Sequence, residues 1–278
     1  MTITRPYFSI IITKSNNTEG TQRLLNSIKD QNFTGFEIII ADSEPQLQSN
    51  NEHKFPPELS VQFNPAGAAT SETRARNLSA SLAVGKYLLF LDSNNELPPG
   101  FLEHAYFILK QDKEDKALLW HPISYVDESV TPKQVYKKHW EATVDFDQAI
   151  CIRLFQINMH WGIFMPTLAF IETGGLSETI KEHKNIDLFS KLISYGCIPS
   201  ENKSNSVYYY LDKRSRARSE KISISNQIKE INYILESYSE FFNKDFMAKS
   251  MLHWKLERLI LKENSNIAKD ASAALSLS

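Results

Sequence analysis

The stretch GKYLLFLDSNNELPPGF, residues 85–101, decides how we expect the chain to fold. Its apolar run, residues 87–91, ends abruptly at Asp92, and a polar turn followed by two prolines comes next. A short continuous apolar run that ends at turn residues predicts a strand buried on both of its faces. The sequence therefore predicts a buried strand that carries a carboxylate, Asp92, at its carboxyl end.

The same pattern occurs in the residues before this stretch, where predicted strands and helices alternate. Such alternation predicts a parallel sheet flanked by helices, and in these sheets ligands bind beyond the carboxyl ends of the strands. Asp42 also ends a predicted strand, so Asp42 and Asp92 are expected at the same edge. The predicted strands are residues 7–13, 35–42 and 59–64, and the predicted helices are residues 17–31 and 71–85.

The helix over residues 71–85 is expected to bury one stripe, formed by Ala75, Leu78, Leu82 and Ala83. The chain after residue 101 is less regular but contains further elements. Later patterns predict strands at residues 116–126 and 204–212, an amphipathic helix at 185–196, and two more helices at 224–242 and 246–262.

Composition limits the class of protein. The chain has 278 residues, 42% of them hydrophobic, which is enough for one large domain or for a domain with an appendage. A net charge of −2 gives no global basic field, so no nucleic-acid partner is expected. Two isolated cysteines indicate neither a disulfide framework nor a zinc site. Without a recognisable signal peptide or membrane-spanning run, we expect a cytoplasmic protein that could still lie on the inner membrane face.

Four segments together resemble inverting family-2 glycosyltransferases with the GT-A fold. FSIIITKSNN is similar to the family's opening strand and turn, and GFEIIIADSE is similar to its second strand. TRARNLSASLAVGKYLLFLDSNNELPPGFLE is similar to its Ala-Arg-Asn helix, Gly-x-Tyr strand and D-x-D turn. FIETGGLSETIKEHKNIDLFSKLISYG is similar to its Gly-Gly-Phe-x-Glu segment and the acidic helix that follows. The four occur in the family's order within residues 7–212.

The resemblance implies a fold and a domain division. The fold is α/β, with a mixed, mostly parallel GT-A sheet flanked by helices and with a C-terminal helical extension. Residues 1–212 are expected to form the GT-A domain, with a nucleotide-binding half at 1–97 and an acceptor half at 98–212. Residues 213–278 are expected to form a basic loop and the helical extension.

The D-x-D turn of the family holds a divalent metal, Mg²⁺ or Mn²⁺, that bridges the diphosphate of a nucleotide-sugar. This sequence keeps the first acid, Asp92, but has Asn94 in place of the second. An amide oxygen can ligate a hard cation without adding charge, so metal affinity is expected to fall. The alternative interpretation is that Asp92 only caps the turn before the next helix.

Other positions are expected by resemblance to contact the donor. Thr13 lies where the family usually has proline, at the end of the opening strand. Asp42 is expected to contact the base or ribose, and Arg76 to position the nucleotide. Arg214 and Arg216 belong to the basic run LDKRSRARS, which follows a strand where the family has a mobile loop near the diphosphate. Guanidinium groups bind phosphate in a bidentate manner, although an exposed basic loop without this role is the alternative.

The catalytic base is the least certain assignment. Inverting transfer needs a base for the acceptor's hydroxyl proton, and the family supplies an aspartate where this chain has Asn185. An amide cannot accept a proton at neutral pH. Three explanations are open: Glu182 or His183 serves as the base, Asp187 serves, or the protein does not catalyse transfer.

The function implied by the resemblance is transfer of a sugar from a nucleotide-sugar, UDP-linked, to a glycan or lipid-linked acceptor in cell-surface polysaccharide synthesis. The alternative is a degenerate glycosyltransferase-like module for binding or scaffolding. Trp140, His160, Trp161 and Phe164 form either an acceptor platform or plain core. The helix at 246–262 is expected to dock on the domain or to form a homodimer, with an anionic membrane surface as a further possible partner.

Overall fold

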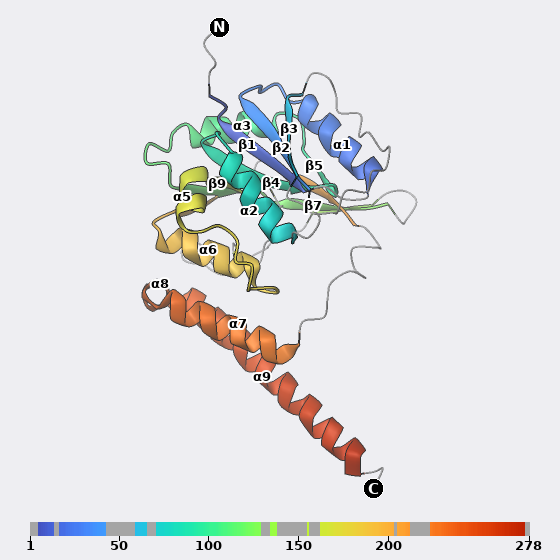
Figure 1. Ribbon diagram of the computed structural model, residues 1–278, viewed down its shortest axis with the longest axis vertical. Helices are drawn as coiled ribbons and strands as arrows, with labels where there is room; N and C mark the ends of the chain where they lie inside the picture. Colours follow the sequence, from blue (N-terminus) through green and yellow to red (C-terminus); the bar gives the residue numbers. More distant parts are fainter. Residues whose placement is uncertain are drawn as a thin grey trace.

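The computed structural model describes residues 5–13, 17–42, 59–65, 71–128, 134–137, 155, 162–202, 205–211 and 223–275 (Figure 1). Its centre is a seven-stranded sheet in the order β10-β6-β9-β4-β1-β2-β3. Parallel pairing joins β1 to β2 and β4, β2 to β3, and β6 to β10, whereas β9 runs antiparallel to both of its neighbours. The strands are β1 Phe8–Thr13, β2 Phe36–Asp42, β3 Val61–Pro65, β4 Tyr87–Asp92, β6 Ala117–Trp120, β9 Phe164–Pro166 and β10 Ile198–Glu201. The expected mixed, mostly parallel sheet is confirmed.

Helices cover both faces of this sheet, and successive residues of β1 show how. Ile10 and Ile12 belong to a hydrophobic cluster with α1, Thr18–Lys29, and α3, Phe101–Leu109. Ile11 belongs to a second cluster on the opposite face. That cluster includes residues of α2 Glu72–Leu82, α5 Thr167–Glu172 and α6 Lys184–Ser194. Because alternate side chains of a strand point to opposite faces, a continuous apolar run is needed where both faces are covered.

The expected buried stripe of α2 is confirmed for Ala75, while Leu78 and Leu82 were predicted wrongly. Leu78 and Leu82 are 39% and 48% exposed. The face turned to the protein consists of Thr73, Ala75, Arg76, Ser79 and Ala80. Small side chains let the helix lie close to the sheet, so the sheet-facing side of α2 is not its most apolar side.

The single strand expected at residues 116–126 is also wrong, because two strands occupy it. β6 ends at Trp120, and β7 Ile123–Asp127 joins a second sheet in the order β5-β11-β7-β8. The break falls at Pro122, which has no N–H to donate and restricts the backbone of the residue before it. The other strands of this sheet are β5 Asn95–Glu96, β8 Gln134–Lys137 and β11 Val207–Tyr210.

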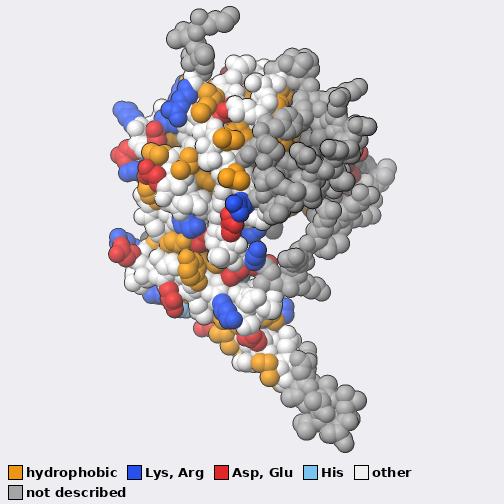
Figure 2. All heavy atoms as spheres, in the orientation of Figure 1, with side chains coloured by type: hydrophobic (Ala, Val, Ile, Leu, Met, Phe, Trp, Pro, Cys, Tyr) orange, Lys and Arg blue, Asp and Glu red, His pale blue; other side chains and the backbone are white. Residues whose placement is uncertain are grey.

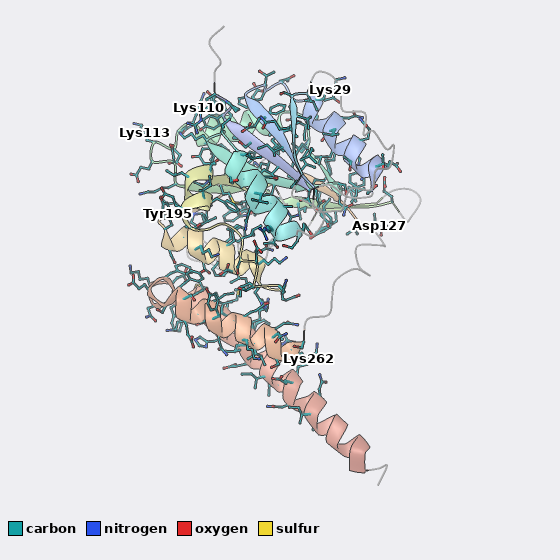
Figure 3. All side chains as sticks on the ribbon, in the orientation of Figure 1. Lys29, Lys110, Lys113, Asp127, Tyr195 and Lys262 are labelled. Carbon is teal, nitrogen blue, oxygen red and sulfur yellow. The ribbon has the colours of Figure 1, made fainter. Side chains whose placement is uncertain are left out.

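The C-terminal helices α7 Ile224–Ser237, α8 Ser239–Lys244 and α9 Phe246–Leu275 dock on the domain. Ile231 and Leu252 are buried in the same cluster as Leu188 of α6, which confirms docking for this part of the extension. The later half of α9 projects away from the body, and Lys262 lies on it (Figures 1 and 3). A homodimer or membrane contact through these helices stays a prediction.

The visible surface carries basic and acidic side chains interspersed, with apolar side chains scattered between them (Figure 2). Within the described residues, no helix combines the length and the apolar character that crossing a bilayer would require.

Candidate active site

The carboxyl ends of β1, β2 and β4 meet at one edge of the main sheet. Thr13, the last residue of β1, pairs with Asp92 of β4 and with Ala41 of β2. Asp42 follows Ala41, so its backbone lies at the same edge. The side chain of Asp42 lies outside the described residues. The edge expected from the strand pattern therefore exists.

Helix α2 brings Arg76 to this edge. Ser71 caps the helix by accepting a hydrogen bond from the backbone N–H of Arg74, 3.2 Å away. The Arg76 side chain is buried, and its Nε donates to Oγ1 of Thr13 over 2.9 Å. Its Nη2 lies 2.5 Å from Oε1 of Glu72, one helical turn earlier. Thr13 thus supplies an acceptor that the proline usual in the resembled family would not, and the predicted residues Thr13 and Arg76 are in contact.

Asp92 begins a tight turn that its own side chain stabilises. Its Oδ1 accepts a hydrogen bond from the backbone N–H of Asn94 over 2.8 Å. Its backbone N–H donates to Oδ1 of Asn95 over 3.0 Å. Helix α1 packs against this turn so closely that a Cβ at Gly20 would overlap the carbonyl oxygen of Ser93. Asp92 therefore does cap this turn, and the cap uses its Oδ1.

The electrostatic environment of Asp92 is unusual for an aspartate. Burial raises the pKa of its carboxyl to about 6, against the lowering effects of the Asn94 N–H and the Arg76 guanidinium. Burial raises carboxyl pKa values because it penalises the charged form. Strongly perturbed pKa values in a site of converging charged groups are typical of functional sites.

Asp92 and Asn94 fit a divalent cation that also binds a ligand's oxygen atoms. Among the described residues, no group of three or more His, Cys, Asp or Glu side chains is placed to hold a metal ion. Asp92 offers one carboxylate and Asn94 one amide oxygen. Mg²⁺ is commonly held by one or two carboxylates together with substrate phosphates. Asp92 and Asn94 therefore suit Mg²⁺ or Mn²⁺ bound together with a diphosphate, and not a cation held by protein atoms alone.

The second sheet places the start of the basic loop beside the same turn. The backbone N–H of Tyr210, the last residue of β11, donates to the carbonyl oxygen of Asn94 over 2.8 Å. Arg214 and Arg216 follow a few residues later and lie outside the described residues, so their role in phosphate binding stays a prediction.

Lys184, the first residue of α6, is a residue that sequence reasoning missed. Its Nζ donates to Oγ1 of Thr73 in α2 over 3.0 Å. Burial lowers its pKa, the Glu72 carboxylate raises it and the Arg76 guanidinium lowers it. Thr73 follows Glu72 in the first turn of α2, so Lys184 contacts the same turn from which Glu72 pairs with Arg76. Lys184 stands where the resembled family has an acid, and that substitution was the signal available in the sequence. We call Thr13, Glu72, Arg76, Asp92 and Lys184 the rim.

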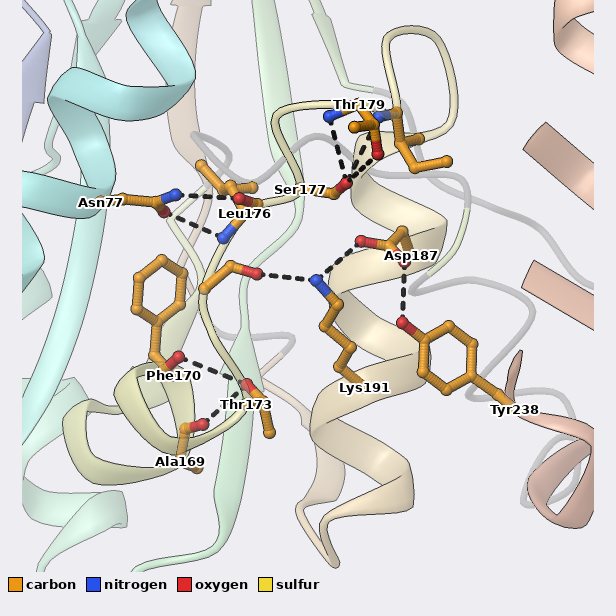
Figure 4. Close-up of polar contacts among 12 residues, drawn as sticks. Asn77, Ala169, Phe170, Thr173, Leu176, Ser177, Thr179, Asp187, Lys191 and Tyr238 are labelled. Atoms are coloured by element: carbon orange, nitrogen blue, oxygen red, sulfur yellow. Dashed lines mark hydrogen bonds and ion pairs between the residues drawn. The ribbon is translucent and has the colours of Figure 1, made fainter. Parts of the chain in front are cut away.

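Asp187 is not part of the rim. Its side chain is fully buried in α6, and its Oδ1 accepts a hydrogen bond from the Tyr238 hydroxyl over 2.8 Å (Figure 4). Its Oδ2 lies 3.0 Å from Nζ of Lys191, which also donates to the carbonyl oxygen of Gly175 over 3.1 Å. The carboxylate joins α6 to the C-terminal helices, and its role as a base stays a prediction.

His183 and Glu182 precede α6 and differ in exposure. His183 is buried, with Nδ1 3.0 Å from Oε2 of Glu230 in α7. Burial and the Lys255 ammonium lower its pKa to about 4, against the opposing effect of Glu230. The side chain of Glu182 is exposed. Of the three predicted bases, Glu182 is therefore the one open to solvent.

The aromatic residues predicted to form either an acceptor platform or plain core are described only in part. Phe164 is fully buried, with the ring centroids of Phe8 and Phe101 4.8 and 5.7 Å away, so it belongs to the core and not to an acceptor platform. Trp140, His160 and Trp161 lie outside the described residues.

Asn77 is a second residue whose role was missed. Its side-chain amide donates to the carbonyl oxygen of Leu176 over 2.8 Å and accepts from the N–H of Leu176 over 2.9 Å (Figure 4). Gly175 has a φ of +63°, and a Cβ there would lie 2.7 Å from Oδ1 of Asn77. The Ala-Arg-Asn segment thus uses its arginine at the rim and its asparagine to fasten the Gly-Gly segment to α2.

The mixed, mostly parallel sheet flanked by helices is the architecture of GT-A glycosyltransferases. The family model described as Glycosyl transferase family 2 matches residues 9–165, and the chain belongs to this family. It is 25% identical over 246 residues to an "Uncharacterized glycosyltransferase" of Haemophilus influenzae, covering 83% of this chain and 76% of that protein.

Solved structures show the same fold. S. aureus TarS 1–349 in complex with UDP-GlcNAc superposes with a TM-score of 0.65 at 17% identity, covering 82% of this chain and 65% of that one. TarS 1–349 in complex with UDP gives a TM-score of 0.56 at 18% identity, covering 86% and 72%. This chain therefore spans slightly less than two thirds of the first of these structures.

Proposed function

We propose that this glycosyltransferase uses a nucleotide-sugar, UDP-linked, whose diphosphate binds at the rim. The observation that carries the proposal is the meeting of Thr13, Arg76, Asp92 and Lys184 beyond the carboxyl ends of parallel strands. α1, α2 and α6 also begin at this edge, and helix N-termini favour anions. The binding of UDP and UDP-GlcNAc by TarS supports UDP as the nucleotide.

The proposed reaction is transfer with inversion. An acceptor hydroxyl oxygen attacks the anomeric carbon, the bond from that carbon to the diphosphate oxygen breaks, and the nucleoside diphosphate leaves with the electron pair. Arg76 and Lys184 stabilise the charge that grows on the diphosphate. Mg²⁺ or Mn²⁺ bound by Asp92 and Asn94 would add further neutralisation.

Glu182 is the base that we favour. It is the exposed member of the predicted set, whereas His183 and Asp187 are buried and already bonded to other side chains. A base must reach the acceptor hydroxyl within hydrogen-bond distance or through one water. We further propose a glycan or lipid-linked acceptor in cell-surface polysaccharide synthesis, at the cytoplasmic face of a membrane.

A binding or scaffold module is the second candidate. It is favoured by Asn94 and Asn185, which replace acids at the metal and base positions, and by the full burial of Asp187. Such a module would keep the nucleotide site and lack transfer.

A titration of UDP with and without Mn²⁺, followed by calorimetry and by thermal stability, tests the site. A ligand that binds the folded state raises its melting temperature by mass action. Arg76→Met should weaken binding, and Arg74→Met, on the exposed side of the same helix, should not. Binding with slow hydrolysis of a UDP-sugar supports the enzyme, whereas binding without hydrolysis or transfer supports the module. Absence of any binding contradicts the rim as a donor site.

A further inference from the structure

One carboxylate of the C-terminal extension holds the segment that leads into α6. Glu230 of α7 is buried, and its Oε1 accepts a hydrogen bond from the backbone N–H of Lys181 over 2.6 Å. Its Oε2 accepts from the backbone N–H groups of Glu182 and His183 over 3.1 and 3.2 Å. The same oxygen lies 3.0 Å from Nδ1 of His183. A single side chain therefore has four polar contacts with three successive residues.

Glu230 holds the turn that leads into α6. Its three backbone partners are Lys181 and Glu182, which precede the helix, and the N-cap residue, His183. His183 makes no capping hydrogen bond with its own side chain. Hydrogen bonds to a charged acceptor such as the Glu230 carboxylate are about twice as strong as neutral ones. The neutral His183 ring donates its Nδ1–H to the carboxylate, because burial keeps the ring uncharged.

The residue that follows this segment is Lys184 of the rim. With residues 181–183 fixed, the Lys184 side chain starts from a fixed position and reaches Thr73 beside Arg76 and Glu72. An ammonium group has three N–H donors. One of them is used by Thr73, and the described residues give no second hydrogen-bond partner. Lys184 and Arg76 both contact the first turn of α2, Lys184 through Thr73 and Arg76 through Glu72, so an oxyanion bound at this turn would lie near both cations.

We propose that Glu230 is a positioning residue for the donor site: from the C-terminal helices it fixes residues 181–183 so that Lys184 binds the donor diphosphate beside Arg76. The inference rests on the proposed function, since it assigns a role within the same site. It makes the helical extension part of the donor site without any direct contact between Glu230 and the donor. The alternative is that the Glu230 contacts support stability alone.

The test measures UDP affinity by calorimetry for Glu230→Gln in the full-length chain. We expect a loss of about tenfold or more in affinity, and a rise in KM with a smaller change in kcat for a UDP-sugar. Glu236→Gln is the matched control, because Glu236 is an exposed carboxylate on the same helix. Ile234→Val lowers stability within the buried face of α7 and leaves the Glu230 contacts intact. Both controls should bind UDP like the unmodified chain.

Lys184→Met supplies the second arm, with Lys181→Met as its exposed control. If Glu230 acts through Lys184, Glu230→Gln should have little further effect on UDP affinity in the Lys184→Met background. If Glu230→Gln does not fold, Glu230→Asp, which keeps the charge on a shorter side chain, is judged by the same criteria.

The outcomes separate the two proposals. Normal UDP affinity in Glu230→Gln, or losses that simply add to those of Lys184→Met, overturns the positioning role and leaves the donor site standing. A loss equal to that of Ile234→Val also overturns it, because general loosening then explains the effect. No binding of UDP by the unmodified chain overturns the proposed function and this inference together.

Discussion

At the scale of single residues, Asp92 shows how the site opposes stability. Its pKa in the folded protein, about 6, lies above the ordinary value of 3.8. Between these two pH values the folded protein binds more protons at this position than the unfolded chain does. The contribution of Asp92 to stability therefore falls as pH rises through this window. A partly buried carboxylate whose pKa is raised in this way is typical of a functional site that needs negative charge at a fixed position.

Asp92→Asn should accordingly stabilise the protein at pH 8 and have little effect at pH 4. The difference between the two pKa values corresponds to at most about 3 kcal/mol, and solvent contact at the rim reduces this to roughly 1–2 kcal/mol. The asparagine can still accept the hydrogen bond from Asn94. Chemical denaturation at both pH values measures the effect. A less stable variant at pH 8 would show that its partners stabilise the carboxylate more than burial destabilises it.

The same group predicts how donor binding depends on pH. The affinity for a UDP-sugar in the presence of Mn²⁺ should rise about tenfold between pH 5 and 7, as Asp92 ionises with a pKa of about 6. His183, whose pKa is lowered to about 4, stays neutral across this range. Calorimetry on the unmodified chain and on Asp92→Asn measures the dependence. A variant that keeps the same pH profile would assign the titration to another group.

At the scale of elements, the sequence predicts what local patterns determine. The apolar runs that became β1, β2 and β4 needed no knowledge of their neighbours, because burial on both faces demands apolar residues throughout. The face of α2 was mispredicted, since Leu78 and Leu82 favour an apolar stripe that the close sheet contact excludes. The site residues are harder to predict from the sequence. Arg76 belongs to a recognisable motif, whereas the contacts of Lys184 and Glu230 form only when α6 packs against α2 and α7.

Asn77→Ala tests how α2 is fastened to the Gly-Gly segment. The change removes two hydrogen bonds and leaves the N–H and carbonyl groups of Leu176 without these partners. We expect a loss of about 1–3 kcal/mol in the free energy of unfolding. Ser81→Ala, an exposed position on the same helix, should change it by less than about 0.5 kcal/mol. Equal stability of the two variants would mean that water replaces the lost contacts at no cost.

At the scale of the whole molecule, the C-terminal helices belong to the core of the domain. The cluster beneath α6 continues into α7, α8 and α9, and Asp187 and His183 both bond to side chains of these helices. The division at residue 212 stays a prediction, but the packing indicates that the part before it depends on the part after it. A domain boundary is expected where few contacts connect the two sides. Here the hydrophobic cluster and the buried Glu230 carboxylate both connect residues before 212 to residues after it.

A chain that ends at residue 222 should therefore fail to unfold cooperatively or should aggregate. It loses four side chains that are at most 1% exposed, those of Ile231, Ile234, Phe242 and Leu252. Burial of each contributes about 1.5–3 kcal/mol, and the sum is comparable to the 5–15 kcal/mol that stabilises a typical domain.

A chain that ends at residue 262 keeps all four and should melt within about 2 °C of the full-length chain, because residues 264–268 are exposed. Calorimetric scans of the two truncations against the full-length chain measure the difference. A cooperative transition at an unchanged temperature for the shorter chain would show that residues 1–222 fold on their own, and the helical extension would then be a separate unit that only rests on α6.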